Sequence, residues 1–328
     1  MDLKNLSSPY ILYRFPDEEN FVFEELTIAD KNDFTFQIQS FNQEKNYFFK
    51  GLKNFEINPK DFPSENLNEI SQGLKIFESP IFTWEIYRNK CDFFIQEIQK
   101  GRFEKLVLSR IFKGLKNPNL GELFANLSKK YPKALIYLLH LGDEIWLGAT
   151  PELLLEIKNN KLQTMALAGT RSTEYPHPWT EKELYEHQVV VDYISKALEN
   201  LNPKVEETKT ITLNNLQHLM TPISANWSDE SAVEHLISRL HPTPAVCGLP
   251  QREAFEFILE NEGYNRSFYT GILGFKNQTS ITYFVNLRCA RISHSGMDVF
   301  VGGGITAASQ ALAEWEETEL KAKVLLDF

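Results

Sequence analysis

The sequence predicts an α+β fold with large antiparallel β-sheets, and three observations point to it. Residues 1–80 alternate apolar and polar side chains in short runs separated by turn residues, which is typical of antiparallel strands. Residues 133–167 contain four consecutive strand-like runs, the last two joined by Asn159-Asn160 as a tight hairpin turn. Helical segments interrupt the strands without the regular strand–helix alternation of a parallel sheet.

The composition is that of an ordinary globular protein. The 328 residues are 42% hydrophobic and 24% charged, and 34 basic against 44 acidic residues give a net charge of −10. This charge argues against a nucleic-acid or membrane-surface protein, because both need a basic footprint. The three scattered cysteines fit a reducing cytosol and argue against a zinc site. We find no signal-peptide pattern and no run of about 18 apolar residues, so we expect a cytoplasmic protein.

The elements can be assigned in chain order. Residues 1–84 form a strand-rich N-terminal portion that we interpret as scaffold, since no candidate chemistry lies there. Apolar spacing predicts a helix over 84–100, which Gly101 is placed to end. Thr180 begins a long helix that we extend to Leu201, with Glu183 in the capping-box position. The remaining expected elements are strands at 104–112, 133–140, 144–148, 153–157, 161–167, 208–213, 216–227, 270–276, 279–293 and 298–302, and helices at 120–131, 231–240, 251–261 and the C-terminus.

The last strand and the final helix carry the first candidate site. Gly302-Gly303-Gly304 end a strand before a helix, and glycines there let backbone N–H groups approach an anion closely. Glu314 and Glu317 are three residues apart with Lys321 four further on, so the three side chains share one helix face. Two carboxylates there suggest a hard cation that bridges to an anionic ligand. A solvated acidic face explains the same spacing equally well.

Lys105 and Glu152 are the candidate acid–base residues. Lys105 is centred in an apolar strand, where loss of hydration favours the neutral amine that a general base needs. Glu152 lies between a proline-fixed turn and an apolar strand, where burial raises the pKa of a carboxyl and makes it a proton donor. The alternatives are a lysine whose ammonium group reaches water and an exposed glutamate at the start of a strand.

The long helix repeats the acidic spacing of the final one. Glu183 and Glu186 are three residues apart. Two helices that each carry an acidic pair can face one divalent ion, and carboxylate ligands fit Mg²⁺ better than zinc. We interpret His187 beside them as a packed helix histidine, since no HExxH pattern is present.

A few further residues could contact a ligand. Gly169-Thr170 end a strand with a glycine that permits close approach and a threonine hydroxyl. Arg288 lies among apolar neighbours in a predicted strand and can bind a carboxylate through two donors. A surface ion pair is the alternative for Arg288, and a hydrogen-bonded core histidine is the alternative for His218 and His241.

In their order along the chain, these segments resemble the chorismate-utilising enzyme family, which includes isochorismate, salicylate, anthranilate and aminodeoxychorismate synthases. The matching pieces fall within residues 85–326 and include KLVLSR at 105–110, GATPEL at 148–153, LHPTPAVCGLP at 240–250, EGYNRSFYTG at 262–271 and EWEETELK at 314–321. The resemblance implies one chorismate-binding domain over residues 1–328. It also implies two large antiparallel β-sheets packed face to face with helices outside, a monomer, chorismate as substrate, and Mg²⁺ as cofactor.

The resemblance also implies a role for each matched residue. Lys105 would be the general base that activates water, and Glu152 the general acid that protonates the departing C4 hydroxyl. The Mg²⁺ ion would have Glu186 and Glu317 as direct ligands, with Glu183 and Glu314 holding its water molecules. The substrate would be contacted by Gly169, Thr170, His218, Ala245, Tyr269, Arg288, Lys321 and a glycine turn around Gly303.

The residue types favour the family members that use water as nucleophile. Lys105 can activate water, and Ala168 stands where aminodeoxychorismate synthases carry a nucleophilic lysine. Ala245-Val246 resembles the synthases that stop at isochorismate, because the pyruvate-releasing salicylate synthases tend to carry a hydroxyl residue there. The resemblance thus implies a Mg²⁺-dependent isochorismate synthase, an isomerase, which we expect to serve menaquinone rather than siderophore biosynthesis. The alternatives are a salicylate synthase and, outside the family, a non-catalytic β-rich binding protein.

Overall fold

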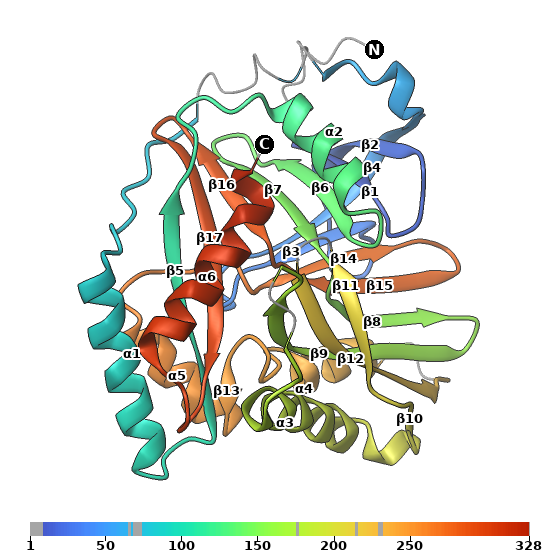
Figure 1. Cartoon of the computed structure of the whole chain (residues 1–328). Helices are drawn as coiled ribbons and strands as arrows, with labels where there is room; N and C mark the ends of the chain where they lie inside the picture. Colours follow the sequence, from blue (N-terminus) through green and yellow to red (C-terminus); the bar gives the residue numbers. More distant parts are fainter. Residues whose placement is uncertain are drawn as a thin grey trace.

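The fold is built around one large antiparallel sheet. The computed structural model describes residues 9–64, 67, 74–174, 177–213, 216–228 and 232–327. Seventeen strands in these ranges belong to one hydrogen-bonded network, in which each pairing is antiparallel. The α+β prediction with an antiparallel sheet and helices outside is confirmed (Figure 1).

The strand order divides the sheet into two halves. The first half runs in the order β13 (Gly248–Leu249), β5 (Lys105–Lys113), β17 (Gly296–Ile305), β16 (Cys289–Ser293), β7 (Ile145–Thr150), β6 (Leu135–His140) and β1 (Tyr10–Arg14). The second half runs in the order β3 (Phe36–Gln39), β14 (Ile272–Lys276), β15 (Ser280–Val285), β8 (Leu153–Lys158), β9 (Lys161–Ser172) and β12 (Leu216–Asn226). Two short strands, β10 (Lys204–Val205) and β11 (Lys209–Leu213), pair with β12.

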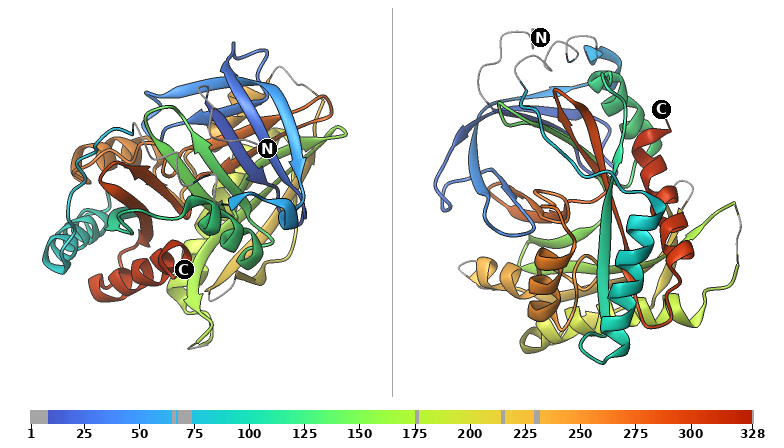
Figure 2. Two further views of the ribbon diagram at one scale, coloured as in Figure 1. Left: turned by 90° about the horizontal axis from the view of Figure 1, so that it is seen from above. Right: turned by 90° about the vertical axis from the view of Figure 1, so that its left-hand side faces the viewer.

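The N-terminal strands join the halves, which refines the prediction of two sheets. β2 (Phe21–Ile28) pairs with β1, and β4 (Asn46–Ile57) pairs with both β2 and β3. The strand pairing is therefore continuous from one half of the sheet to the other. The right-hand view of Figure 2 shows these N-terminal strands, in blue, curving over the end of the molecule opposite the yellow-green helix that follows β9. One continuous sheet therefore folds back on itself, and residues 9–57 close the fold instead of standing beside it.

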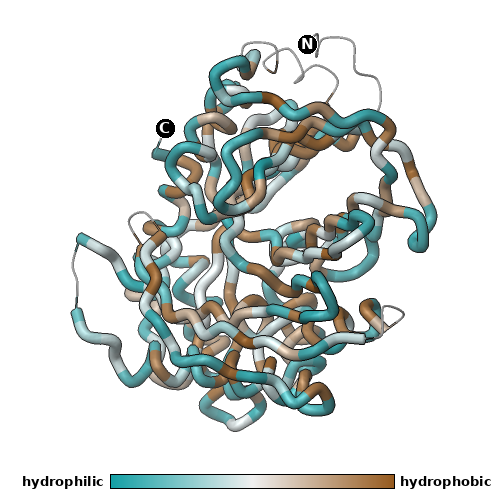
Figure 3. Tube along the Cα trace, turned by 90° about the vertical axis from the view of Figure 1, so that its right-hand side faces the viewer, coloured by the Kyte–Doolittle hydropathy of each residue, from teal (hydrophilic) through white to brown (hydrophobic). Residues whose placement is uncertain are grey.

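An apolar cluster fills the space between the two halves. Side chains from β1, β6, β7 and β17 meet side chains from β3, β14 and β15, and the cluster includes Tyr137, Trp146, Phe36, Leu273 and Phe300. Figure 3 shows hydrophobic residues concentrated along the strands and hydrophilic ones at the peripheral loops. Alternation of apolar and polar residues along each strand produces this arrangement, because successive side chains point to opposite faces.

Helices cover the outer faces of the sheet. Apolar residues of α2 (Leu120–Lys130) and α6 (Ala311–Leu326) pack on the first half, and those of α3 (Glu181–Ala197) and α4 (Val233–Leu240) pack on the second. The helices α1 (Trp84–Gln99) and α5 (Gln251–Asn261) pack together beside β5. Two short 3-10 helices, η1 (Pro59–Asp61) and η3 (Glu199–Leu201), also lie within the described ranges. No helix in the described ranges is long and apolar enough to cross a membrane.

Local sequence signals set most element boundaries. The Thr83 and Asn119 side chains cap α1 and α2, and Thr180 with Glu183 forms the predicted capping box of α3. The predicted hairpin turn is present, with Asn159 and Asn160 at φ values of 52° and 58°. The long helix was predicted to reach Leu201, whereas α3 ends at Ala197 and only the short η3 follows.

One predicted strand was wrong in a way that matters for the site. The expected strand 279–293 is two strands, β15 and β16, separated by residues 286–288. β15 pairs with β14 and β8 in one half, whereas β16 pairs with β7 and β17 in the other. The chain must change halves between them, and Arg288 at the crossing adopts a left-handed φ of 49°.

Candidate active site

A cavity lies where the chain crosses between the halves of the sheet. One crossing, at Pro151-Glu152, connects β7 to β8, and the other, at Leu287-Arg288, connects β15 to β16. Most of the predicted site residues line this cavity, namely Glu152, Gly169, Thr170, Glu186, His218, Ala245, Tyr269, Arg288, Gly303 and Lys321. The structure thus brings together residues that lie up to 169 positions apart, from Glu152 to Lys321.

Lys105 is fully buried in β5 and has a partner that the apolar strand did not reveal. Its Nζ lies 2.9 Å from Oε1 of Glu186, although the geometry does not meet the angles of a hydrogen bond. The two side chains are 0% and 11% exposed. The alternative in which the ammonium group reaches water is therefore wrong, and Lys105 belongs to a buried charge cluster.

Glu152 is buried at the edge of the same cavity. Its side chain is 4% exposed, and burial raises the pKa of its carboxyl to about 7, while Lys105, Arg288 and Lys321 act in the opposite direction. The expectation of a raised pKa at this position is confirmed. A carboxyl with this pKa can carry a proton at neutral pH and release it to a bound substrate.

Three carboxylates gather around the predicted cation position. Glu314 Oε1 is 2.6 Å from the Lys182 Nζ, and Glu317 Oε1 is 2.6 Å from the Lys321 Nζ. Glu314, Glu317 and Glu186 together outweigh burial and raise the pKa of Lys182, so one ammonium group already lies among all three. Lys182 is a site residue that the sequence analysis missed, although its position one helical turn before Glu186 was a signal for it.

The Glu314–Glu317 pair shows the electrostatic strain of neighbouring buried carboxylates. Burial and the charge of Glu317 raise the pKa of Glu314 to about 7. Burial also acts on Glu317, but Lys321 and Lys182 hold the pKa of that carboxyl below its usual value. Within the described residues, Glu314 Oε2 is a buried oxygen without a hydrogen-bond partner. Such an oxygen is costly unless a cation or a donor meets it.

The donor set fits Mg²⁺ by its chemistry. Three carboxylates surround the Lys182 ammonium group, and one of them has an unpartnered oxygen. Carboxylate oxygens are the hard ligands that Mg²⁺ prefers. No three His, Cys, Asp or Glu side chains of the described chain already lie in metal-binding geometry. The carboxylates are instead paired with Lys105, Lys182 and Lys321.

Glu183 caps the start of α3 with one of its two carboxylate oxygens, and its expected role in holding water molecules of the ion stays a prediction. Its Oε2 accepts hydrogen bonds from the Thr180 N–H at 2.8 Å and the Thr180 hydroxyl at 3.0 Å. The capping box therefore uses the carboxylate. The i,i+3 spacing places Glu183 and Glu186 on one helix face, and the Glu183 carboxylate also caps the start of the helix.

The predicted glycine turn is also corrected. Gly302, Gly303 and Gly304 lie inside β17 and pair with Ser109, Leu108 and Val107 of β5, and α6 begins only at Ala311. A Cβ on Gly304 would lie 2.1 Å from Glu186 Oε1, and one on Gly302 would lie 3.0 Å from the Tyr269 hydroxyl. Gly302 and Gly304 are needed because side chains of the site press against this strand, whereas a Cβ on Gly303 would make only ordinary contacts.

A β-bulge aims Gly169 and His218 into the cavity. The register of β9 on β12 pairs Thr170 with His218 and Ala168 with Leu219, so Gly169 is the extra residue, with a left-handed φ of 73°. Burial and the charges of Arg288 and Lys321 lower the pKa of His218 to about 3, so the ring is neutral. The alternative of a core histidine applies instead to His187, which bonds Thr221, and to His241, which bonds the Thr270 carbonyl.

The His218 contacts fix its tautomer and orient Arg288. Arg288 Nη2 lies 3.3 Å from His218 Nε2 and can only donate, so Nε2 accepts. The ring proton is then on Nδ1, which lies 3.0 Å from the Gly169 carbonyl oxygen. The guanidinium is thus held at the cavity wall by a neutral ring. The alternative of a surface ion pair for Arg288 is excluded.

Known proteins resemble this chain over most of its length. The sequence pattern described as "Chorismate binding enzyme" matches residues 9–328 and so includes the N-terminal strands. The isochorismate synthase MenF of Haemophilus influenzae is 34% identical over 286 residues, which are 80% of this chain and 65% of that protein. The salicylate biosynthesis isochorismate synthase of Pseudomonas aeruginosa is 31% identical over 246 residues, 70% of this chain and 52% of that protein.

The chain spans about half to two thirds of the length of these two relatives. Among solved structures, MenF, the menaquinone-specific isochorismate synthase of Escherichia coli, aligns with a TM-score of 0.78 and 19% identity. The alignment covers 99% of this chain and 90% of that one, which shows a shared fold.

Proposed function

The chain belongs to the chorismate-binding enzyme family, and we propose that it is an isochorismate synthase, an isomerase that moves the hydroxyl of chorismate from C4 to C2. One observation carries the proposal: Glu152, a buried carboxyl with a raised pKa, lines the cavity, and the fully buried Lys105 amine behind the lining acts on that pKa and pairs with the cavity-lining Glu186. A non-catalytic binding protein would have no use for this costly arrangement. The relatives that match most of the chain carry the name isochorismate synthase.

The cavity supplies contacts for a substrate with two carboxylates. Arg288 and Lys321 are the cations at its wall, and the Tyr269 hydroxyl and the Thr170 hydroxyl are donors. Gly169, with its left-handed backbone, leaves room for close approach of the ring carboxylate. His218 and Ala245 form the sides of the ring pocket. An arginine fork at a carboxylate gives both charge and orientation.

Two side chains perform the proton transfers in this proposal. Lys105, as the neutral amine, takes a proton from water while the water oxygen bonds to C2. Both double bonds of the ring diene shift by one position, the C4–O bond breaks, and Glu152 gives its proton to the departing oxygen, which leaves as water. One water is consumed and one is released, so the net change is a hydroxyl transposition.

The ion pair of Lys105 bears directly on this role. An ammonium group that stays paired with Glu186 cannot accept a proton. Glu186 is also one of the proposed Mg²⁺ ligands, together with Glu317 and, through water, Glu314. When bound, Mg²⁺ would neutralise the ring carboxylate and orient the ring. A Glu186 carboxylate turned toward the ion would no longer hold the Lys105 ammonium.

The test is direct product analysis. The purified protein is incubated with chorismate and Mg²⁺, and the products are separated by chromatography. Isochorismate without pyruvate supports the proposal. Salicylate with stoichiometric pyruvate assigns a salicylate synthase instead, and unchanged chorismate at every Mg²⁺ concentration overturns both. The monomer, the cytoplasmic location and the menaquinone pathway stay predictions.

A further inference from the structure

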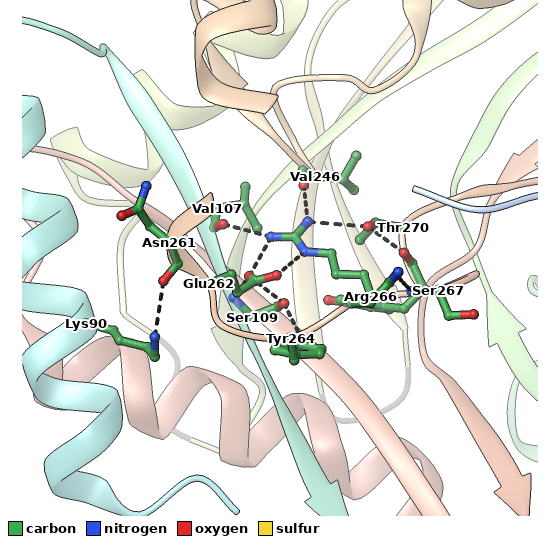
Figure 4. Close-up of polar contacts among 12 residues, drawn as sticks. Lys90, Val107, Ser109, Val246, Asn261, Glu262, Tyr264, Arg266, Ser267 and Thr270 are labelled. Atoms are coloured by element: carbon green, nitrogen blue, oxygen red, sulfur yellow. Dashed lines mark hydrogen bonds and ion pairs between the residues drawn. The ribbon is translucent and has the colours of Figure 1, made fainter. Parts of the chain in front are cut away.

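A sealed ion pair lies behind the cavity wall, between Glu262 and Arg266. Their side chains are each 1% exposed. Arg266 Nε donates to Glu262 Oε2 at 2.6 Å and Nη2 donates to Oε1 at 2.7 Å, a fork on a carboxylate (Figure 4). Neither residue lines the cavity, and neither has a part in the proton transfers proposed above.

The other donors of Arg266 reach three separate segments. Nη1 donates to the Val246 carbonyl at 2.8 Å and to the Thr270 hydroxyl at 3.3 Å, and Nη2 donates to the Val107 carbonyl at 2.9 Å. Val107, Val246 and Thr270 all line the cavity. With the two bonds to Glu262, the five N–H groups of the guanidinium are all used.

Each segment held by Arg266 carries a residue of the proposed site. Val107 is two residues from Lys105 in β5, Val246 follows Ala245, and Thr270 follows Tyr269. The three segments are far apart in sequence, so the guanidinium sets their relative positions across the cavity.

Glu262 also connects Arg266 to Ser109, which lies two residues after Val107 in β5. Its Oε1 accepts the Ser109 N–H at 2.7 Å and the Ser109 hydroxyl at 2.6 Å. The Tyr264 hydroxyl lies 2.5 Å from that serine oxygen (Figure 4). The strand that carries Lys105 is thereby fixed at both Val107 and Ser109.

Thr270 shows that the network holds a strained conformation. Its φ is 58°, in the left-handed region that a β-branched residue rarely adopts. Such a conformation is costly and persists only where surrounding contacts impose it. Arg266 donates to the hydroxyl of Thr270, and His241 Nε2 lies 2.8 Å from its carbonyl oxygen.

We propose that Arg266 is a positioning residue that sets the spacing of Lys105, Ala245 and Tyr269 around the substrate, with Glu262 holding its guanidinium. Lysine cannot replace it, because an ammonium group has three donors and no fork, whereas five acceptors on four residues surround this site. The effect on catalysis rests on the proposed function, but the effect on the three segments does not.

The test compares Arg266→Lys with a matched control, Arg14→Lys. Arg14 is also buried, at 3% exposure, and also donates to backbone carbonyls, those of Tyr131 at 2.7 Å and Pro132 at 2.9 Å. None of these residues lines the cavity. Both variants should unfold at a lower temperature than the wild type. Below both transitions, Arg266→Lys should lower kcat about tenfold or more, and Arg14→Lys should leave kcat within about twofold.

Hydrogen exchange provides a readout that needs no activity. In Arg266→Lys, peptides covering 105–109, 243–247 and 267–271 should all exchange faster, while Arg14→Lys leaves them unchanged. If the wild type fails to convert chorismate but this pattern appears, the proposed function fails and the positioning role stands. If kcat and exchange in the three segments are the same in both variants, the positioning role is overturned.

A second variant keeps the proposal testable if Arg266→Lys does not fold. Thr270→Gly removes both the left-handed strain and the hydroxyl that Arg266 holds. We expect an unfolding temperature equal to or above that of the wild type together with a lower kcat, and recovery of kcat in Thr270→Ser, which keeps the hydroxyl. A Thr270→Gly enzyme with the kcat of the wild type would contradict the proposal.

Discussion

The molecule contains two clusters of buried charge that differ in how well their polar atoms are satisfied. In the sealed cluster, Glu262 and Arg266 use both carboxylate oxygens and all five guanidinium N–H groups. The other cluster, beside the cavity, comprises the Glu186, Glu314 and Glu317 carboxylates and the lysines paired with them, and we call it the cavity cluster. In it, Glu314 Oε2 and Lys105 Nζ have no hydrogen-bond partner among the described residues. Both clusters lie next to β5, but the Glu262 and Arg266 side chains are each 1% exposed. Those of Lys182, Glu317 and Lys321 are 23%, 18% and 15% exposed.

This difference distinguishes a structural charge cluster from one that awaits a ligand. A buried charge with incomplete partners costs several kcal/mol, which a fold tolerates only where something else supplies the missing contacts. The sealed cluster needs nothing from outside, so it can only position its neighbours. The cavity cluster is arranged around groups that a cation, a water molecule or a carboxylate must complete.

The largest expected effect is the loss of proton transfer in the cavity cluster. Lys105→Ala and Glu152→Gln should each lower kcat by about 10²–10⁴, because each removes one of the two proposed proton-transfer groups. Glu152→Gln should keep chorismate binding, as measured by calorimetry. Lys113→Ala is the control, since Lys113 lies on the same strand with a side chain that is 48% exposed. Turnover of Glu152→Gln near that of the wild type would remove the acid role.

The next effect concerns the cation that the cavity cluster is expected to bind. Glu317→Gln should weaken Mg²⁺ binding by more than about tenfold in calorimetry, because it removes a proposed ligand. Lys182→Ala should strengthen it a few-fold, because the Lys182 ammonium lies among the same carboxylates. Chelator should abolish activity, and added Mg²⁺ should restore it. Equal Mg²⁺ affinity in wild type and Glu317→Gln would contradict the assignment.

A smaller effect is expected from opening the sealed cluster. Ser109→Ala leaves Glu262 without the hydroxyl at 2.6 Å, although the backbone N–H bond remains. We expect a loss of about 1–3 kcal/mol in the free energy of unfolding, measured with urea, because a buried charged acceptor loses a donor. Mg²⁺ affinity should not change. A shift in Mg²⁺ affinity would show that the two clusters are coupled.

The smallest effect is a pH dependence from Glu152. Because the folded pKa of about 7 lies above the ordinary value of 4.5, the folded state favours the protonated carboxyl. Its stabilising contribution is complete below pH 4.5 and is lost as the pH rises through 7. Urea titrations at several pH values should show a slope of at most about 1.4 kcal/mol per pH unit from this group. The slope should be shallower in Glu152→Gln.

The sequence by itself determined the elements and the residue types of the site. Helix and strand periods, the Thr180–Glu183 capping box and the Asn159-Asn160 turn depend on neighbours a few positions away, so their signals are local. The order of motifs identified the family, and most of the predicted site residues do line one cavity.

Tertiary structure alone decided which charges meet. It paired Lys105 with Glu186, used Glu183 as a cap and placed Arg288 at a crossing between the halves of the sheet. It also gave Arg266 its five acceptors, which lie in segments up to 159 positions away. The reason is physical: spacing along a chain fixes which side chains share a face, but the partners of a buried charge come from strands and loops that only the folded sheet brings within hydrogen-bond distance.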